Sequence, residues 1–253
     1  MAKITAAELF SSDTEVRLLY NEIKEENPHF SYDELDIIFE LALKTKSLFP
    51  DAYKKEDLTP KTYLSRWITS YCSEIISPPH AKIANPKSSC SDPAIRHIIR
   101  ISQNISEDTV VHMEHVHNLF MSAENLQGGL LEEYIAVCTR PYGWIWCAGS
   151  TMKSIDFCTC NGIFLQIKNK SNTENSSSST VRDGTTIHKW VRLSTVHRNK
   201  KPIPRYNWEK LNSFVNEHKT CGYQLSPCNM SENGYISFIT ALISNNHYII
   251  TSE

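Results

Sequence analysis

The stretch SIDFCTCNGIFLQIKNK, residues 154–170, decides the fold of the central part of the chain. Both halves are rich in β-branched and aromatic residues, and Asn161-Gly162 between them is a strong hairpin signal. The pattern therefore predicts two neighbouring antiparallel strands. The first carries Asp156, and the second carries Gln166 and Lys168 among apolar residues. Polar groups in such strands need partners or a chemical role, because burying them uncompensated is costly.

The alternation of side chains along the second strand places Gln166 and Lys168 on one face and the odd-numbered apolar residues on the other. A strict two-residue Asn-Gly turn would set Asp156 opposite Ile167, on the wrong face. A three-residue connection over residues 160–162, or a bulge, would instead set Asp156 opposite Gln166. A site shared by the three polar groups therefore requires that the connection is not a simple two-residue turn.

Composition places the chain among globular proteins. It has 253 residues, of which 40% are hydrophobic and 21% are charged, enough for one large domain or two small ones. The sequence contains no apolar run of about 18 residues, so no membrane span is predicted. The first residues also lack the apolar stretch of a signal peptide. Eight cysteines without such a signal indicate reduced thiols. We expect a cytoplasmic protein with no membrane partner.

Charge is distributed unevenly along the chain. Residues 1–76 contain nine Lys and Arg against fourteen Asp and Glu, a balance of −5. Residues 166–219 contain eleven Lys and Arg against four acids, a balance of +7. A basic second half suggests a surface for a polyanion, and the alternative is an ordinary solvated basic face.

The coarse pattern is helical at first and turns to strands near residue 143. We expect helices over 33–49, 60–76, 92–102, 106–126, 130–137, 207–218 and 235–244, with a break at Gly128-Gly129, and strands over 143–149, 154–158, 163–170 and 187–193. This order predicts an α/β (α+β) fold, a mixed β-sheet core flanked by helices. We divide it into a helical N-terminal region, residues 1–124, and a core over residues 125–253, with a single compact domain overall as the alternative.

Asp156, followed by Gln166-x-Lys168 on the next strand, resembles the signature of the PD-(D/E)XK nucleases. In that family an acid ends one strand, and an acid-x-Lys pair lies on its neighbour. The resemblance implies phosphodiester cleavage with Mg²⁺, or with Mn²⁺ as a substitute, held by carboxylate oxygens. Lys168 would polarise the attacking water. Gln166 departs from the acid of the commonest pattern and removes one negative charge from the site.

Related nucleases often place a glutamate on the helix before the catalytic strands. Glu132 and Glu133 are the candidates here. The spacing Gly129-x-x-x-Glu133 matches that arrangement slightly better, so we prefer Glu133. The alternative is a helix N-terminus enriched in acids. The predicted catalytic residues are Asp156, Gln166, Lys168 and Glu133, and the predicted metal ligands are Asp156, Gln166, Ile167 and Glu133.

The segment over about residues 125–195 resembles the SinI-type restriction endonucleases, which cut short GC-rich palindromes of the GGWCC kind. Most of the likeness lies in Lys168-Asn169-Lys170, in the Asn- and Ser-rich tract over 172–179, and in Lys189-Trp190 with Arg192. We find no comparable likeness in the first hundred residues. The resemblance implies a restriction-endonuclease-like fold and a homodimer on double-stranded DNA, one active site per strand. A cognate DNA methyltransferase would be a functional, not a physical, partner.

The tract after the second strand would lie along the DNA, where amides, hydroxyls and cations contact phosphates and base edges. The predicted DNA-binding residues are Asn169, Lys170, Asn172, Glu174, Asn175, Ser176, Ser177, Ser178, Arg182, Lys189 and Arg192. We expect Trp190 in the core, and residues 197–201 as a phosphate-contacting loop or a solvated basic turn. The alternative functions are a nicking or repair nuclease, and a DNA-binding module whose nuclease site has decayed. Asp156 and Lys168 argue against the second.

Overall fold

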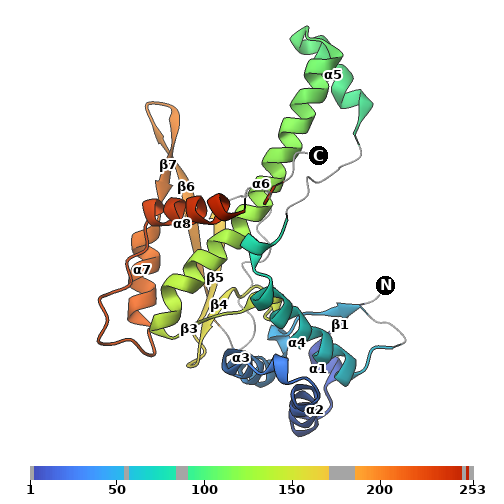
Figure 1. Ribbon diagram of the computed structural model, residues 1–253, viewed down its shortest axis with the longest axis vertical. Coiled ribbons are helices and arrows are strands. Elements are labelled where there is room, and N and C mark those ends of the chain that lie inside the picture. Colours follow the sequence, from blue (N-terminus) through green and yellow to red (C-terminus); the bar gives the residue numbers. More distant parts are fainter. Residues whose placement is uncertain (1–2, 54–56, 84–90, 171–185, 247–248, 251–253) are drawn as a thin grey trace.

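The computed structural model describes residues 3–53, 57–83, 91–170, 186–246 and 249–250. Helices surround a central sheet of five strands in which parallel and antiparallel pairs are mixed (Figure 1). This confirms the predicted fold class, a mixed β-sheet core flanked by helices. Among the described residues, no helix combines the length and the apolar character that crossing a membrane requires.

The N-terminal part is a group of helices with a small two-stranded sheet. Its elements are β1 (Lys3–Ile4), α1 (Ala6–Leu9), α2 (Asp13–Glu26), α3 (Asp33–Lys44), β2 (Ala52–Tyr53) and α4 (Pro60–Ile76). The predicted helix over 60–76 agrees with α4, whereas the one over 33–49 ends at Lys44 and is followed by a 3₁₀ turn over Lys46–Leu48. The prediction of a helical N-terminal region is thus confirmed for this part of the chain.

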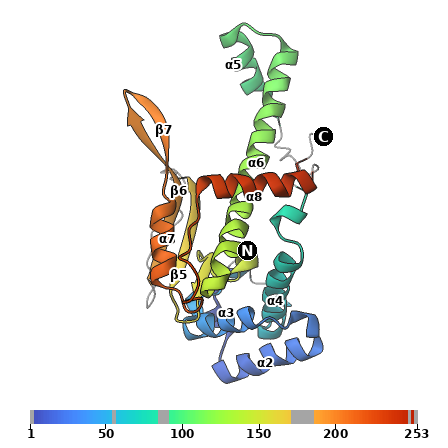
Figure 2. The ribbon, with the colours of Figure 1, turned by 60° about the vertical axis from the view of Figure 1, so that its left-hand side comes forward.

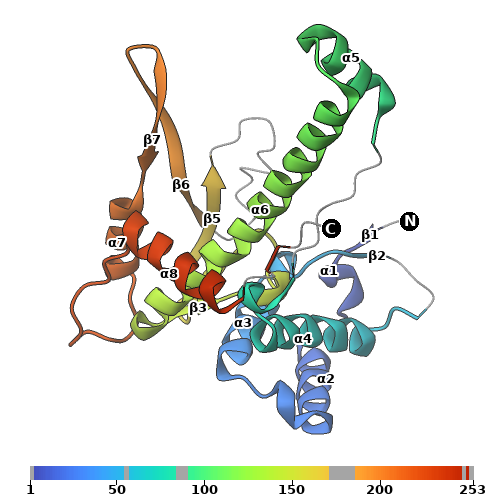
Figure 3. The same ribbon diagram turned by 45° about the horizontal axis from the view of Figure 1, so that its top comes forward.

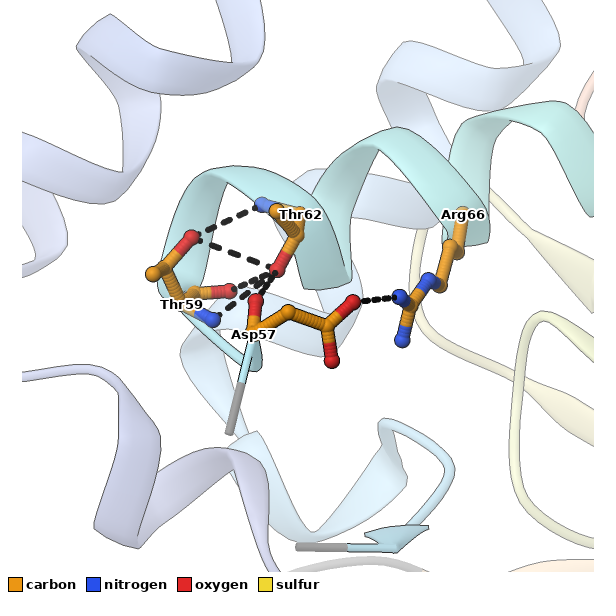
Figure 4. Close-up of polar contacts among 4 residues, drawn as sticks. All are labelled: Asp57, Thr59, Thr62 and Arg66. Atoms are coloured by element: carbon orange, nitrogen blue, oxygen red, sulfur yellow. Dashed lines mark hydrogen bonds and ion pairs between the residues drawn. The ribbon is translucent and has the colours of Figure 1, made fainter. Parts of the chain in front are cut away.

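The start of α4 is fixed by local chemistry (Figure 4). The Thr59 hydroxyl accepts the Thr62 N–H at 3.2 Å, and the Thr62 hydroxyl accepts the Thr59 N–H at 2.9 Å. Pro60 occupies the first helical turn, where its missing N–H costs nothing. Arg66 pairs with Asp57 at 2.6 Å across the same turn. Such a reciprocal cap stabilises a helix by about 1 kcal/mol and explains why α4 begins here.

Helices α5 (Pro93–Gln103) and α6 (Glu107–Thr139) form a hairpin that projects from the body (Figures 1 and 3). The predicted break at Gly128-Gly129 is wrong, because α6 continues through both glycines. A Cβ atom at Gly129 would lie 2.8 Å from the Pro79 side chain, so close packing offsets the helix cost of glycine, about 1 kcal/mol. The proposed division between residues 124 and 125 falls inside this continuous helix.

The central sheet has the strand order β3-β4-β5-β6-β7, in which only β5 and β6 run parallel. The strands are β3 (Trp144–Trp146), β4 (Phe157–Thr159), β5 (Phe164–Lys170), β6 (Ile187–Arg198) and β7 (Lys201–Tyr206). Sequence patterns predicted the first four and missed β7. The basic segment over 197–201 forms a tight hairpin turn instead of a loop, with positive φ angles at Asn199 and Lys200.

Two apolar cores lie on the two faces of the sheet. The first core contains side chains of the four helices α1, α2, α3 and α4, packed against Ile145, Cys158 and Phe164 of the sheet. The second core joins Leu165, Ile167 and Trp190 to α6 and to two later helices, α7 (Trp208–Glu217) and α8 (Glu232–Asn245). Helix α8 crosses α6 (Figure 2). Side chains at even-numbered positions of β5 therefore face the N-terminal helices.

The two glycines of α6 provide a test of this packing. Gly128→Ala should raise the free energy of unfolding by about 0.5–1 kcal/mol, because nothing lies within 4 Å of the added Cβ. Gly129→Ala should lower it by about 1–3 kcal/mol, because the added Cβ meets Pro79. Urea unfolding of the two variants measures both values. An equal gain in stability from both would show that α6 does not pack against Pro79.

Candidate functional site

The connection between β4 and β5 consists of residues 160–162. The Thr159 N–H donates to the Ile163 carbonyl at 3.1 Å, and these two residues close the connection. The register along the strands then sets Asp156, the residue before β4, opposite Gln166. This confirms the prediction that the connection is not a two-residue Asn-Gly turn.

Asp156 is tied to β5 by main-chain and side-chain hydrogen bonds. Its N–H donates to the Leu165 carbonyl at 3.0 Å, and its carboxylate accepts the Ile167 N–H at 2.6 Å. Desolvation raises the pKa of the Asp156 carboxyl to about 6, while the Ile167 N–H and the positive charge of Lys168 lower it. Lys168 therefore acts electrostatically on this carboxylate. The Ile167 side chain packs into the second core.

A second carboxylate, Glu132 of α6, lines the same pocket as Asp156. The Trp146 indole N–H donates to Glu132 Oε2 at 3.0 Å and orients it. Desolvation first, and then the negative charge of Asp156, raises the pKa of Glu132 to about 7. Two partly buried carboxylates that disfavour each other's charge form a site that a cation would stabilise.

Gln166 lies opposite Asp156 in the strand register and carries an amide group. Its side chain is only 8% exposed, and its Oε1 atom has no hydrogen-bond partner within the described part of the chain. The alternation along β5 turns it to the same face as Phe164, toward the first core. A buried oxygen without a donor, on the residue opposite Asp156 in the strand register, fits a hard divalent cation, which prefers oxygen ligands.

The pocket that contains both carboxylates has a volume of about 430 Å³, and part of its wall comes from the N-terminal region. Lys3, Pro50 and Asp51 line it together with Lys153. Lys153 Nζ lies 2.5 Å from Asp51 Oδ2, an ion pair that links residues far apart in the sequence. Sequence patterns gave no signal for Asp51, and Lys153 could have been suspected only from its position three residues before Asp156.

The structure does not bring Glu133 to Asp156. The Glu133 carboxylate accepts the His80 N–H at 3.3 Å and also contacts the His80 ring, and it lines a different pocket. Neighbouring residues on a helix point about 100° apart, so only one of the two glutamates can face the Asp156 pocket. The pocket of Asp156 thus contains Glu132 and not the preferred Glu133, whose catalytic role stays a prediction.

The predicted DNA-binding residues fall into three groups. Asn172, Glu174, Asn175, Ser176, Ser177, Ser178 and Arg182 lie outside the described residues. Lys189 is exposed on β6, beside Gln166 in the strand register. Lys170 is exposed at the end of β5, where it pairs with Glu124 at 2.8 Å.

Arg192 and Asn169 form the third group, and the structure uses them internally. Arg192 is only 4% exposed, and its Nε donates to Asn169 Oδ1 at 2.8 Å. Its guanidinium also pairs with Glu232 of α8 and lies 5.2 Å from the Tyr235 ring centre. These contacts join β5, β6 and α8, so the structure gives Arg192 an internal role, and its contact with DNA stays a prediction. The prediction that Trp190 belongs to the core is confirmed.

Comparisons with known proteins place the chain among the restriction endonucleases. The sequence model of the family described as SinI restriction endonuclease matches residues 78–245. The type II restriction enzyme Eco47I of Escherichia coli is 35% identical over 167 residues, which are 63% of this chain and 73% of that enzyme. The type II restriction enzyme SinI of Salmonella infantis is 33% identical over 167 residues, with the same coverage.

The chain belongs to the SinI restriction endonuclease family. This confirms the resemblance drawn from the sequence, and the mixed α/β architecture is consistent with a restriction-endonuclease-like fold. It is an enzyme of the type II site-specific deoxyribonuclease class. The match begins at residue 78, well before the segment over 125–195 that carried the resemblance, so the expectation of no likeness in the first hundred residues is wrong for residues 78–100.

The internal role of Arg192 can be tested by stability. Glu232→Gln should lower the free energy of unfolding by roughly 3 kcal/mol, because it leaves a buried guanidinium uncompensated. Glu124→Gln is the matched control, since it breaks only the exposed pair with Lys170 and should cost about 1 kcal/mol or less. Urea unfolding compares the two. Equal small losses would return Arg192 to the set of residues free to contact DNA.

Proposed function

We propose that this enzyme makes Mg²⁺-dependent double-strand cuts at a short GC-rich palindromic DNA site of the GGWCC kind. The metal dependence is supported by the pair of partly buried carboxylates in one pocket, Asp156 and Glu132, together with the unpartnered oxygen of Gln166, which lies opposite Asp156 in the strand register. Oxygen donors of this kind suit Mg²⁺, and Mn²⁺ would be accepted by the same ligands. The family of the relatives supports the type of reaction.

The metal ligands in this proposal are the Asp156 and Glu132 carboxylates and the Gln166 amide oxygen. When bound, Mg²⁺ neutralises charge on the scissile phosphate and lowers the pKa of a water molecule. Ile167 holds the Asp156 carboxylate in place through its N–H and contributes no side-chain ligand. Trp146 does the same for Glu132 through its indole N–H. Glu132 replaces Glu133 in the proposed catalytic set.

Lys168 supplies the positive charge of the site. It lies two residues after Gln166 on β5 and shares its face. Its ammonium group acts on the Asp156 carboxylate and can polarise the attacking water or stabilise charge on the phosphate. Gln166 carries no charge where the commonest pattern has an acid, so Glu132 supplies the second carboxylate of the site.

A palindromic site has two-fold symmetry, which a homodimer with one active site per strand would match. Lys189 is exposed on β6, beside Gln166 of β5, and is proposed to contact guanine edges or nearby phosphates. Arg182, Asn172 and Asn175 remain predicted DNA contacts outside the described residues. A DNA methyltransferase of the same specificity would protect the host site and is the expected functional partner.

The catalytic assignment predicts the behaviour of two variants on unmethylated phage DNA. Asp156→Ala and Lys168→Ala should each slow cleavage by at least roughly 10²–10³-fold, because each removes a group that stabilises the transition state. Lys168→Ala should still bind duplex DNA. Digestion with Mg²⁺ and with chelator measures cleavage, and a gel-shift assay measures binding. Full activity of either variant would contradict the site, and nicks or smears from the wild type would favour a repair-type nuclease.

The two neighbouring glutamates form a matched pair of variants. Glu132→Gln should raise the Mg²⁺ concentration for half-maximal cleavage at least about 10-fold, since loss of a ligand weakens metal binding at least as much as loss of a supporting group. Glu133→Gln should leave that concentration unchanged, because its carboxylate faces His80. Cleavage rates over a Mg²⁺ titration provide the measurement. The opposite result would restore Glu133 to the site.

A further inference from the structure

Strands β6 and β7 extend beyond the rest of the sheet as a two-stranded ribbon (Figures 1 and 2). The ribbon, residues 194–206, is paired from Ser194 with Arg205 to Arg198 with Lys201. Every residue from Thr195 to Tyr206 is exposed. A projecting ribbon of this kind has both faces available to a partner.

The ribbon carries positive charge and no negative charge. Four cations, Arg198, Lys200, Lys201 and Arg205, lie within it, and no Asp or Glu occurs from Ile187 to Tyr206. Within the described parts of the chain, none of the four forms an ion pair with an acidic side chain. A partner of opposite charge would therefore meet cations that have no competing carboxylate beside them.

The strand register sorts these residues onto two different faces, because cross-strand partners share a face. One face, called the cationic face below, carries Ser194, Val196, Arg198, Lys201, Ile203 and Arg205. The other carries Thr195, His197, Pro202 and Pro204. Three of the four cations are thus gathered on one side, and the fourth, Lys200, lies in the turn.

The prolines of β7 limit what the ribbon can bind. Proline has no N–H, so the outward edge of β7 lacks hydrogen-bond donors at Pro202 and Pro204. A further β-strand could not pair fully along that edge. The partner is therefore expected to contact side chains of the cationic face.

The ribbon also continues directly from the strand pair that contains β5, the strand that carries Gln166 and Lys168. β6 runs parallel to β5, with Val191 beside Lys168 and Leu193 beside Lys170. The ribbon therefore begins one residue beyond the end of β5 and continues in the same direction. From Val191 to Arg198 the strand advances roughly 23 Å, at about 3.3 Å per residue. That distance is less than one turn of duplex DNA, about 34 Å.

We propose that the ribbon binds duplex DNA through its cationic face, an inference that rests on the proposed function. A two-stranded ribbon fits the major groove of B-DNA. Arg198, Lys201 and Arg205 contact phosphates, and between them Val196 and Ile203, each 39% exposed, are available to thymine methyl groups. The ribbon thereby anchors the DNA on one side of the catalytic lysine.

The test measures DNA binding, not cleavage. The ribbon variant is Arg198→Gln with Lys201→Gln and Arg205→Gln, and the matched control is Lys44→Gln with Arg66→Gln and Arg140→Gln, which removes the same charge from exposed positions of the helical part. Fluorescence anisotropy with a labelled 30-base-pair duplex, without divalent cations, gives Kd over a range of salt concentrations. Circular dichroism confirms that each variant is folded.

The ribbon variant should bind about 10²-fold more weakly, and the slope of log Kd against log salt should fall by about 2.7, since each phosphate contact contributes about 0.9. The control should keep the wild-type slope. The single variant Lys201→Gln should lower the slope by about 0.9 and replaces the triple variant if that one unfolds. A slope equal to the wild type in the ribbon variants, or an equal loss in the control, overturns the inference.

Cleavage by the wild type separates this inference from the proposed function. Mg²⁺-dependent cleavage together with an unchanged slope in the ribbon variants would overturn the ribbon and keep the nuclease. Loss of slope in the ribbon variants, together with a wild type that does not cleave, would keep the ribbon as a DNA-binding element and overturn the nuclease.

Discussion

The register between β4 and β5 is the constraint on which the candidate site depends. A slip of one residue would move Gln166 and Lys168 from the face of the first core to the face of the second. The three-residue connection and the Ile167 N–H bond to the Asp156 carboxylate together hold the register. Gly162 makes this connection possible, because its φ of 77° lies in the left-handed region.

The polar groups that this register gathers are costly for the protein to hold. Asp156 and Glu132 each carry a carboxyl whose ionised form is disfavoured by desolvation, and Gln166 keeps an oxygen without a donor. Trp146, Ile167 and Lys168 each compensate only one of these groups. Such an uncompensated set persists because the surrounding cores are well packed, and it is the kind of local cost that functional sites impose on a fold.

Local chemistry made much of the fold predictable. Pro60, Asp92 and Ser106 mark predicted helix starts that the structure reproduces, and the β-rich run around Asn161-Gly162 gave two adjacent strands. The register followed from requiring one face for three polar groups. These predictions succeeded because each depends on residues close together in the sequence.

The failures depend on contacts between distant residues. The helix α6 passes through both glycines and packs against Pro79 at Gly129, and Glu132, not Glu133, lies in the Asp156 pocket, where Trp146 donates to it. The strand β7 was missed because two prolines argue against a strand, although an outer edge tolerates them. Arg192 looks like a DNA contact until its partner Glu232, 40 residues later, is known. None of these outcomes has a local signature.

The Asp51–Lys153 pair joins a residue outside the family match to a residue inside it. The match to the family model begins at residue 78, yet Lys3, Pro50 and Asp51 form part of the wall around the two carboxylates. The wall of the pocket therefore combines residues that precede the family match with residues inside it, such as Met152 and Lys153. Because the pocket wall draws on both segments, the residues before position 78 belong to the immediate surroundings of the candidate site and are not a separate appendage.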